Sequence, residues 1–86
     1  MSADEMFRKL GYDFTYSMKP DKDNKLTVDT IVYYKKIRHI IHTEVVSIIL
    51  NNFDKKIVID SSSKEVTMQE LKAINKKVEE LGWNES

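Results

Sequence analysis

The spacing of apolar residues along the chain changes twice, and each change marks a change in predicted secondary structure. Residues 3–10 and 68–81 carry apolar side chains three or four positions apart, which is helical spacing. Between them, apolar residues alternate with polar ones or form short runs rich in Val, Ile, Thr and Tyr, which is typical of strands. The pattern predicts a helix, a block of strands and a second, longer helix.

Both predicted helices have the same start signal. Ser2 stands three residues before Glu5, and Thr67 stands three residues before Glu70. This is the spacing of a capping box, in which the hydroxyl accepts from the backbone N–H of the third helical residue and the carboxylate accepts from the N–H of the cap. The first helix is therefore expected to begin after Ser2 and the second after Thr67.

Both predicted helices also share a stop signal, a Leu-Gly-aromatic sequence that occurs in KLGY at residues 9–12 and in ELGW at residues 80–83. A glycine ends a helix at low cost because it adopts positive φ. After Gly82, Trp83 reaches the position that contacts Val78 in a Schellman cap. The two segments differ in length and do not otherwise align, so the shared letters predict helix ends and not an internal repeat.

Four strands are predicted between the helices, at residues 13–18, at 26 to about 36, from 40 or 41 to 50, and at 57–60. A segment with Pro, Asp and Asn separates the first pair, and a segment with Asn and Asp separates the last pair. Consecutive strands with short connections favour an antiparallel meander, and a helix packed across it gives two layers. We expect one α+β domain over residues 1–86, with a four-stranded β-meander flanked by a short N-terminal and a long C-terminal helix.

Composition narrows the class of function. The chain has 86 residues with 14 Lys+Arg and 14 Asp+Glu, and a formal net charge of +0 argues against a dedicated nucleic-acid binder without excluding a local basic patch. It has no cysteine, which excludes disulfide and thiolate chemistry, and only two glycines, which excludes a glycine-rich phosphate loop. Without a long apolar segment, a cytoplasmic protein with no membrane partner is expected.

No combination of residues has the spacing of a catalytic or metal site. His39 and His42 lie three positions apart in a β-rich stretch, where an odd separation predicts opposite faces. SSSK at residues 61–64 matches a Ser-x-x-Lys nucleophile by letters but lacks its supporting motifs. Asp60 and Glu65 have no spacing that brings them together. The sequence predicts a protein that is not an enzyme and has no cofactor or metal.

Basic residues near the predicted third strand are the candidate contacts for nucleic acid. They would form one positive end of the sheet if the lysines of the next turn lay beside them, with Tyr33 and Tyr34 as stacking groups. The candidate residues are Lys35, Lys36, Arg38, His39, Lys55 and Lys56. A solvated strand end is the commoner meaning of such a pattern. Nucleic-acid binding is therefore the second hypothesis.

The second, third and fourth predicted strands are apolar on both faces, and one helix covers only one face. The face that remains is expected to form an interface, most commonly in a twofold homodimer. The candidate interface residues are Ile31, Tyr33, Val45, Ile49 and Val58. The alternatives are a monomer whose short helix covers the second face, and a monomer with an open face that binds a different protein.

TMQELKAINKKVEELGW at residues 67–83, together with MFRKLGY near the start, resembles small uncharacterised proteins encoded by phages and prophages of Gram-positive bacteria. The resemblance lies mainly in the C-terminal helix and carries no catalytic or binding residues. It implies a cytoplasmic, phage-derived accessory protein that binds a host component. We therefore expect a non-enzymatic interaction module acting through protein–protein contacts, with a nucleic-acid-binding accessory protein as the alternative.

Overall fold

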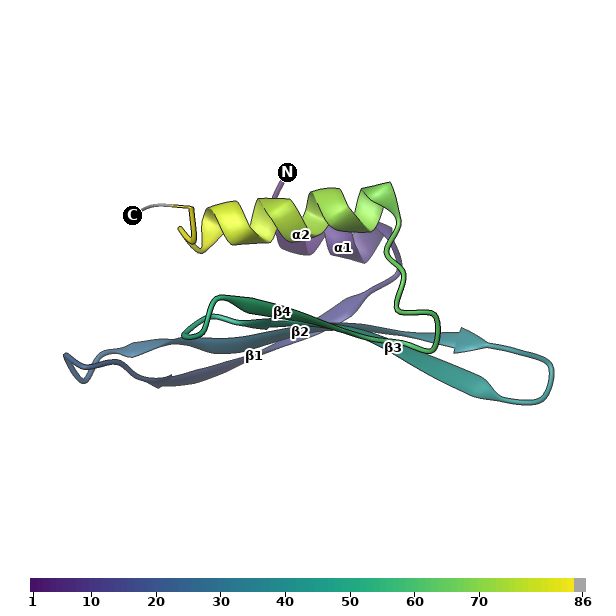
Figure 1. The fold of residues 1–86 in the computed structure, drawn as a ribbon, viewed down its shortest axis with the longest axis horizontal. Helices are drawn as coiled ribbons and strands as arrows, with labels where there is room; N and C mark the ends of the chain where they lie inside the picture. The colour runs from purple at the N-terminus through teal and green to yellow at the C-terminus, as the bar shows by residue number, and fades with distance from the viewer. Residues whose placement is uncertain (85–86) are drawn as a thin grey trace.

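The computed structural model describes residues 1–84 as two helices packed on one side of a sheet (Figure 1). The elements are α1 (Ala3–Lys9), β1 (Asp13–Pro20), β2 (Leu26–Arg38), β3 (Thr43–Asn51), β4 (Lys56–Asp60) and α2 (Met68–Glu80). The four strands form one antiparallel sheet in the order β1-β2-β3-β4. The predicted two-layer α+β meander is confirmed.

The predicted helix starts are confirmed. Ser2 Oγ accepts from the Glu5 N–H at 3.2 Å, and Thr67 Oγ1 accepts from the Glu70 N–H at 3.1 Å. Each glutamate accepts in return from the backbone N–H of its cap, at 3.2 Å in α1 and 2.7 Å in α2. Both boxes satisfy N–H groups that have no partner inside the helix.

The predicted helix ends are also confirmed. Gly11 and Gly82 have φ of 90° and 74°. The Tyr12 N–H donates to the Phe7 carbonyl at 3.0 Å, and the Trp83 N–H donates to the Val78 carbonyl at 3.1 Å. This is the Schellman hydrogen bond, which satisfies carbonyls at the end of the helix. The Leu-Gly-aromatic signature therefore marks helix ends.

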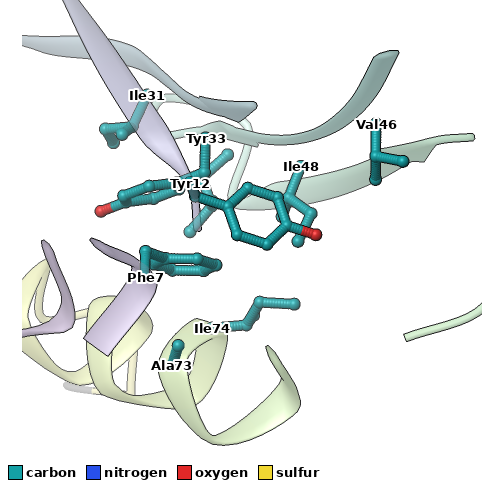
Figure 2. Packing of buried hydrophobic residues seen from close by; sticks show 9 residues of the cluster. Phe7, Tyr12, Ile31, Tyr33, Val46, Ile48, Ala73 and Ile74 are labelled. Atoms are coloured by element: carbon teal, nitrogen blue, oxygen red, sulfur yellow. The ribbon is translucent and has the colours of Figure 1, made fainter. Parts of the chain in front are cut away.

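Alternate residues of the two central strands form the core beneath the helices. Ile31 and Tyr33 of β2 pair with Leu50 and Ile48 of β3, and all four are 0% exposed. Phe7 of α1 stacks on Tyr33 with 3.8 Å between ring centroids (Figure 2). The other buried members of this cluster are Tyr12, Val46, Ala73 and Ile74. We call this side of the sheet the covered face.

A network of polar side chains ties both helices to the covered face. The Tyr33 hydroxyl donates to Asp4 of α1 at 2.5 Å, and the Tyr16 hydroxyl donates to the same carboxylate at 3.0 Å. The Lys77 ammonium of α2 contacts the Tyr16 hydroxyl and lies 3.5 Å from Asp4. Burial alone lowers the pKa of Lys77, but its contacts with Tyr16, Asp4 and Glu80 outweigh burial and raise that pKa. Lys77 is therefore charged and paired inside the fold.

The strand boundaries differ from prediction at the β2–β3 hairpin. β2 continues through the basic stretch to Arg38, and β3 begins at Thr43 and not at residue 40 or 41. The His39 N–H donates to the His42 carbonyl at 2.8 Å, which closes a turn around two isoleucines. Isoleucine favours strands, and that preference misplaced the predicted start of β3.

Residues 1–84 contain no helix that is both long enough and apolar enough to cross a bilayer. The longer of the two helices, α2, has 13 residues, whereas a helical span needs about 20.

Candidate functional site: the open face and the hairpin arm

The side of the sheet away from the helices carries apolar side chains from three strands. Val32 of β2 pairs with Ile49 of β3, which pairs in turn with Val58 of β4, so these side chains form a row across the strands. Tyr34 and Val45 lie on the same side because they are separated from the row by an even number of residues. Val45 and Val58 are 51% and 45% exposed. We call these five residues the open face.

The structure divides the predicted interface between the two faces. Val45, Ile49 and Val58 lie on the open face, as an interface requires. Ile31 and Tyr33 lie on the covered face and are 0% exposed, so their inclusion was wrong. The register explains the error, because Ile31 pairs with Leu50 and not with Ile49. The residues that the prediction omitted are Val32 and Tyr34, which alternate with the buried positions of β2.

Charged residues of both signs surround the open face. Asp13 pairs with Tyr34 across β1 and β2, and Lys36 pairs with Val45 across β2 and β3. Lys56 and Asp60 flank Val58 on β4 at the same parity. An apolar centre containing an aromatic residue, with a charged rim, is the composition of a protein–protein interface.

The β2–β3 hairpin extends past the helices as an arm, which we define as residues 36–43 (Figure 1). Ile40 and Ile41 at its tip are fully exposed. The rings of His39 and His42 stack with 4.4 Å between centroids. The prediction that these histidines lie on opposite faces was wrong, because His39 follows β2 and His42 precedes β3 across a turn, whereas the rule of alternation applies within one strand.

The predicted basic cluster does not come together. Four residues of the predicted cluster lie close together in sequence at this end of the sheet: Lys35 just before the arm, and Lys36, Arg38 and His39 within it. Lys55 and Lys56 lie at the β3–β4 turn, at the opposite end of the sheet, because successive turns of a meander alternate between its two ends (Figure 1). Of the two predicted stacking groups, Tyr33 is buried and Tyr34 is half-buried on the open face. The prediction of a single positive end that includes Lys55 and Lys56 was therefore wrong.

Lys35 has a partner within the fold. Its ammonium lies 3.9 Å from Glu70 of α2 and 4.6 Å from the centroid of the Tyr12 ring. The Tyr12 hydroxyl donates to the same carboxylate, and the Thr67 N–H donates to it at 2.7 Å. Burial alone raises the pKa of Glu70, but the hydrogen bonds from Tyr12 and Thr67 outweigh burial and hold that pKa below its ordinary value. Lys35 therefore anchors α2 to the sheet.

The base of the arm is held by the connection between β4 and α2. Glu44 of β3 accepts hydrogen bonds from the hydroxyl and the backbone N–H of Ser62, the latter at 3.1 Å. The hydrogen bonds from Ser62 lower the pKa of Glu44. His39 Nε2 lies 3.4 Å from the same carboxylate. Lys36, Arg38, His42 and the two isoleucines of the tip are exposed on the arm.

The sequence singled out few metal-ligating residues, and the structure adds no cluster of them. Among the side chains of residues 1–84, no group of three or more His, Cys, Asp or Glu is arranged to hold a metal ion. Beside the stacked histidines of the arm, the carboxylate of Glu44 lies 3.4 Å from His39 Nε2. The open face and the arm are therefore the two candidate sites.

Comparisons of this chain with protein-family models, with curated proteins and with solved structures returned no match. No residue role is therefore transferred from a relative. The open face and the arm are assigned by their own burial, register and charge.

Proposed function

We propose that this chain is a non-enzymatic interaction module that binds a partner protein through the open face. The observation that carries the proposal is the position of both helices on one side of the sheet, which leaves the row of Val32, Ile49 and Val58 without a covering layer (Figure 1). Contiguous apolar patches on small proteins mark interaction sites more often than isolated exposed residues do.

The chemistry of the patch favours a protein as the partner. Tyr34 contributes an amphipathic ring, a residue type that is enriched where interfaces concentrate their binding energy. The rim carries Asp13 and Asp60 as well as Lys36 and Lys56, so the open face has no strong field of one sign. A mixed rim suits a protein surface with its own charges better than it suits a polyanion.

The proposal places the protein in the cytoplasm as a phage-derived accessory protein. A chain without cysteine needs no oxidising compartment to fold. The resemblance of its ends to small phage and prophage proteins supports a role in binding a host component. Catalysis and a cofactor form no part of the proposal.

The open face is tested by capture from a bacterial lysate treated with nuclease, using the full chain as bait. Val45→Lys places a charge on the open face at an exposed position, and Met68→Lys makes the same change at an exposed position of α2. We expect a specific protein that binds the wild type and Met68→Lys and is lost with Val45→Lys. Equal capture by both variants, or capture abolished by nuclease, would contradict the proposal.

One observation favours nucleic-acid binding as a second candidate function. Tyr34, Lys36 and Arg38 alternate along β2 on the side of the open face, so a ring and two cations share one strip that leads into the arm. If this strip binds DNA or RNA, affinity falls steeply with salt and is lost in the double variant Lys36→Glu, Arg38→Glu. No binding at about 50 mM salt would remove this candidate.

A further inference from the structure

The two edge strands of the sheet differ in how they are protected against pairing with another strand. β1 has an irregular register between Ser17 and Met18 and ends in Lys19 and Pro20. Bulges, lysines and prolines are the devices that keep an edge from pairing. β4 is short and begins with Lys56, but it has neither proline nor bulge, and its five residues follow β3 in continuous register. β4 is therefore the edge that is open to a further strand.

The sequence of β4, Lys-Ile-Val-Ile-Asp, is complementary to itself when two copies run antiparallel. Val58 is the middle residue, with Lys56 two positions before it and Asp60 two positions after it. A twofold axis at Val58 places Lys56 of each copy opposite Asp60 of the other, and Ile57 opposite Ile59. Twofold pairing uses every such contact twice, and opposite charges placed directly across two strands stabilise the pair.

The residues that this pairing uses are exposed or lack a charged partner on the neighbouring strand. Across the ladder to β3, Lys56 pairs with Asn51 and Asp60 pairs with Ser47, neither of which is charged. Within residues 1–84, no ion pair involves Lys56 or Asp60. Val58 on the open face is 45% exposed, and Ile57 is 40% exposed even though it lies on the side of the helices. The edge thus offers apolar contacts on both faces between two charges of opposite sign.

We propose that a second copy of this chain occupies the β4 edge, so that two chains pair β4 against β4 about Val58 and form one continuous antiparallel sheet. Residues directly opposite each other in antiparallel strands point to the same face, so both helical layers lie on one side of the dimer. The row of Val32, Ile49 and Val58 continues into the same row of the second copy. The open face thereby doubles in length. This dimer goes beyond the proposed function and does not depend on it.

The dimer is tested by sedimentation equilibrium of the purified full chain from about 1 to 500 µM, a range that brackets micromolar association. In the dimer, position 56 of each copy faces position 60 of the other. Lys56→Glu therefore creates two pairs of like charges, one on each side of the axis, and so does Asp60→Lys. The double variant Lys56→Glu, Asp60→Lys restores both opposite-charge pairs with their direction reversed. We expect each single variant to raise the dissociation constant about tenfold or more, and the double variant to return it to within about threefold of the wild type.

Two controls separate this interface from other causes. Lys22→Glu makes the same charge change in the β1–β2 turn and is expected to leave dimerisation unchanged. Circular dichroism melts of all variants show that each one folds. A monomeric wild type across the whole range, a dimer that resists both single reversals, or a double variant no tighter than the singles would overturn the proposal. Val45→Lys is expected to keep this dimer while losing the partner protein, so the two proposals fail separately.

Discussion

Ile48 and Ile49 are chemically identical neighbours on β3, and they lie in different environments. Ile48 is 0% exposed beneath the helices, whereas Ile49 is half-buried on the open face. The same contrast separates Tyr33 from Tyr34 on β2. Composition does not distinguish the two faces, since both are apolar at their centres. The position of the helices therefore decides which face becomes the core and which remains available for binding.

Polar anchors explain why the helices occupy the covered face. α2 brings Glu70 and Lys77 into the interior, and a buried charge is costly without a partner. On the covered face Glu70 meets Lys35, and Lys77 meets the Tyr16 hydroxyl. The row at the centre of the open face consists of aliphatic side chains, which provide no hydrogen-bond partner. On the covered face both buried charges of α2 therefore have partners next to the apolar core.

The largest effect that separates the two faces is expected from one substitution made at adjacent positions. Ile48→Ala should lower the free energy of unfolding by about 2–5 kcal/mol, because it removes fully buried methyl groups and leaves a cavity. Ile49→Ala should cost about 1 kcal/mol or less, because the side chain is covered on one side only. Urea denaturation of both variants measures the difference. Equal losses would mean that the open face is covered in solution.

A smaller effect is expected from loosening the helix that makes the covered face. Thr67→Ala removes the hydroxyl that caps α2 and should lower the free energy of unfolding by about 1 kcal/mol. Thr67→Ser keeps the acceptor and should stay within a few tenths of a kcal/mol of the wild type. Thermal denaturation of the pair checks the cap. A loss of similar size in both variants would show that the methyl group of Thr67 matters and not its hydrogen bond.

Features that depend on residues close together in the sequence were predicted well. Both capping boxes and both glycine stops are formed by residues within five positions of one another, and both were predicted at the correct positions. The four strands were also predicted, because alternation and turn residues are local signals. The start of β3 was missed because Ile40 and Ile41 have strand propensity but occupy a turn.

Features that depend on which strands meet were predicted poorly. Ile31 was grouped with Ile49, although the register places them on opposite faces, and a shift of one residue is enough to exchange faces. Lys55 was grouped with Lys35, although they lie at opposite ends of the sheet. His39 and His42 were separated, although the turn brings their rings together. Register and the order of strands along the sheet are set by distant contacts, which the pattern of one strand does not contain.

The smallest expected effect concerns acid, and it tests whether Glu70 holds α2 on the covered face. The folded state holds the pKa of Glu70 below its ordinary value near 4.5, so folding favours the ionised carboxylate. The stability that this carboxylate contributes is therefore complete above pH of about 4.5 and is lost as the pH falls through its folded pKa. In Glu70→Gln the group no longer titrates, so the difference in unfolding free energy from the wild type should be largest near pH 7 and shrink toward pH 3. Glu79→Gln, on the exposed side of α2, is the matched control. A difference that stays constant with pH would mean that the charge of Glu70 does not help to hold the helix in place.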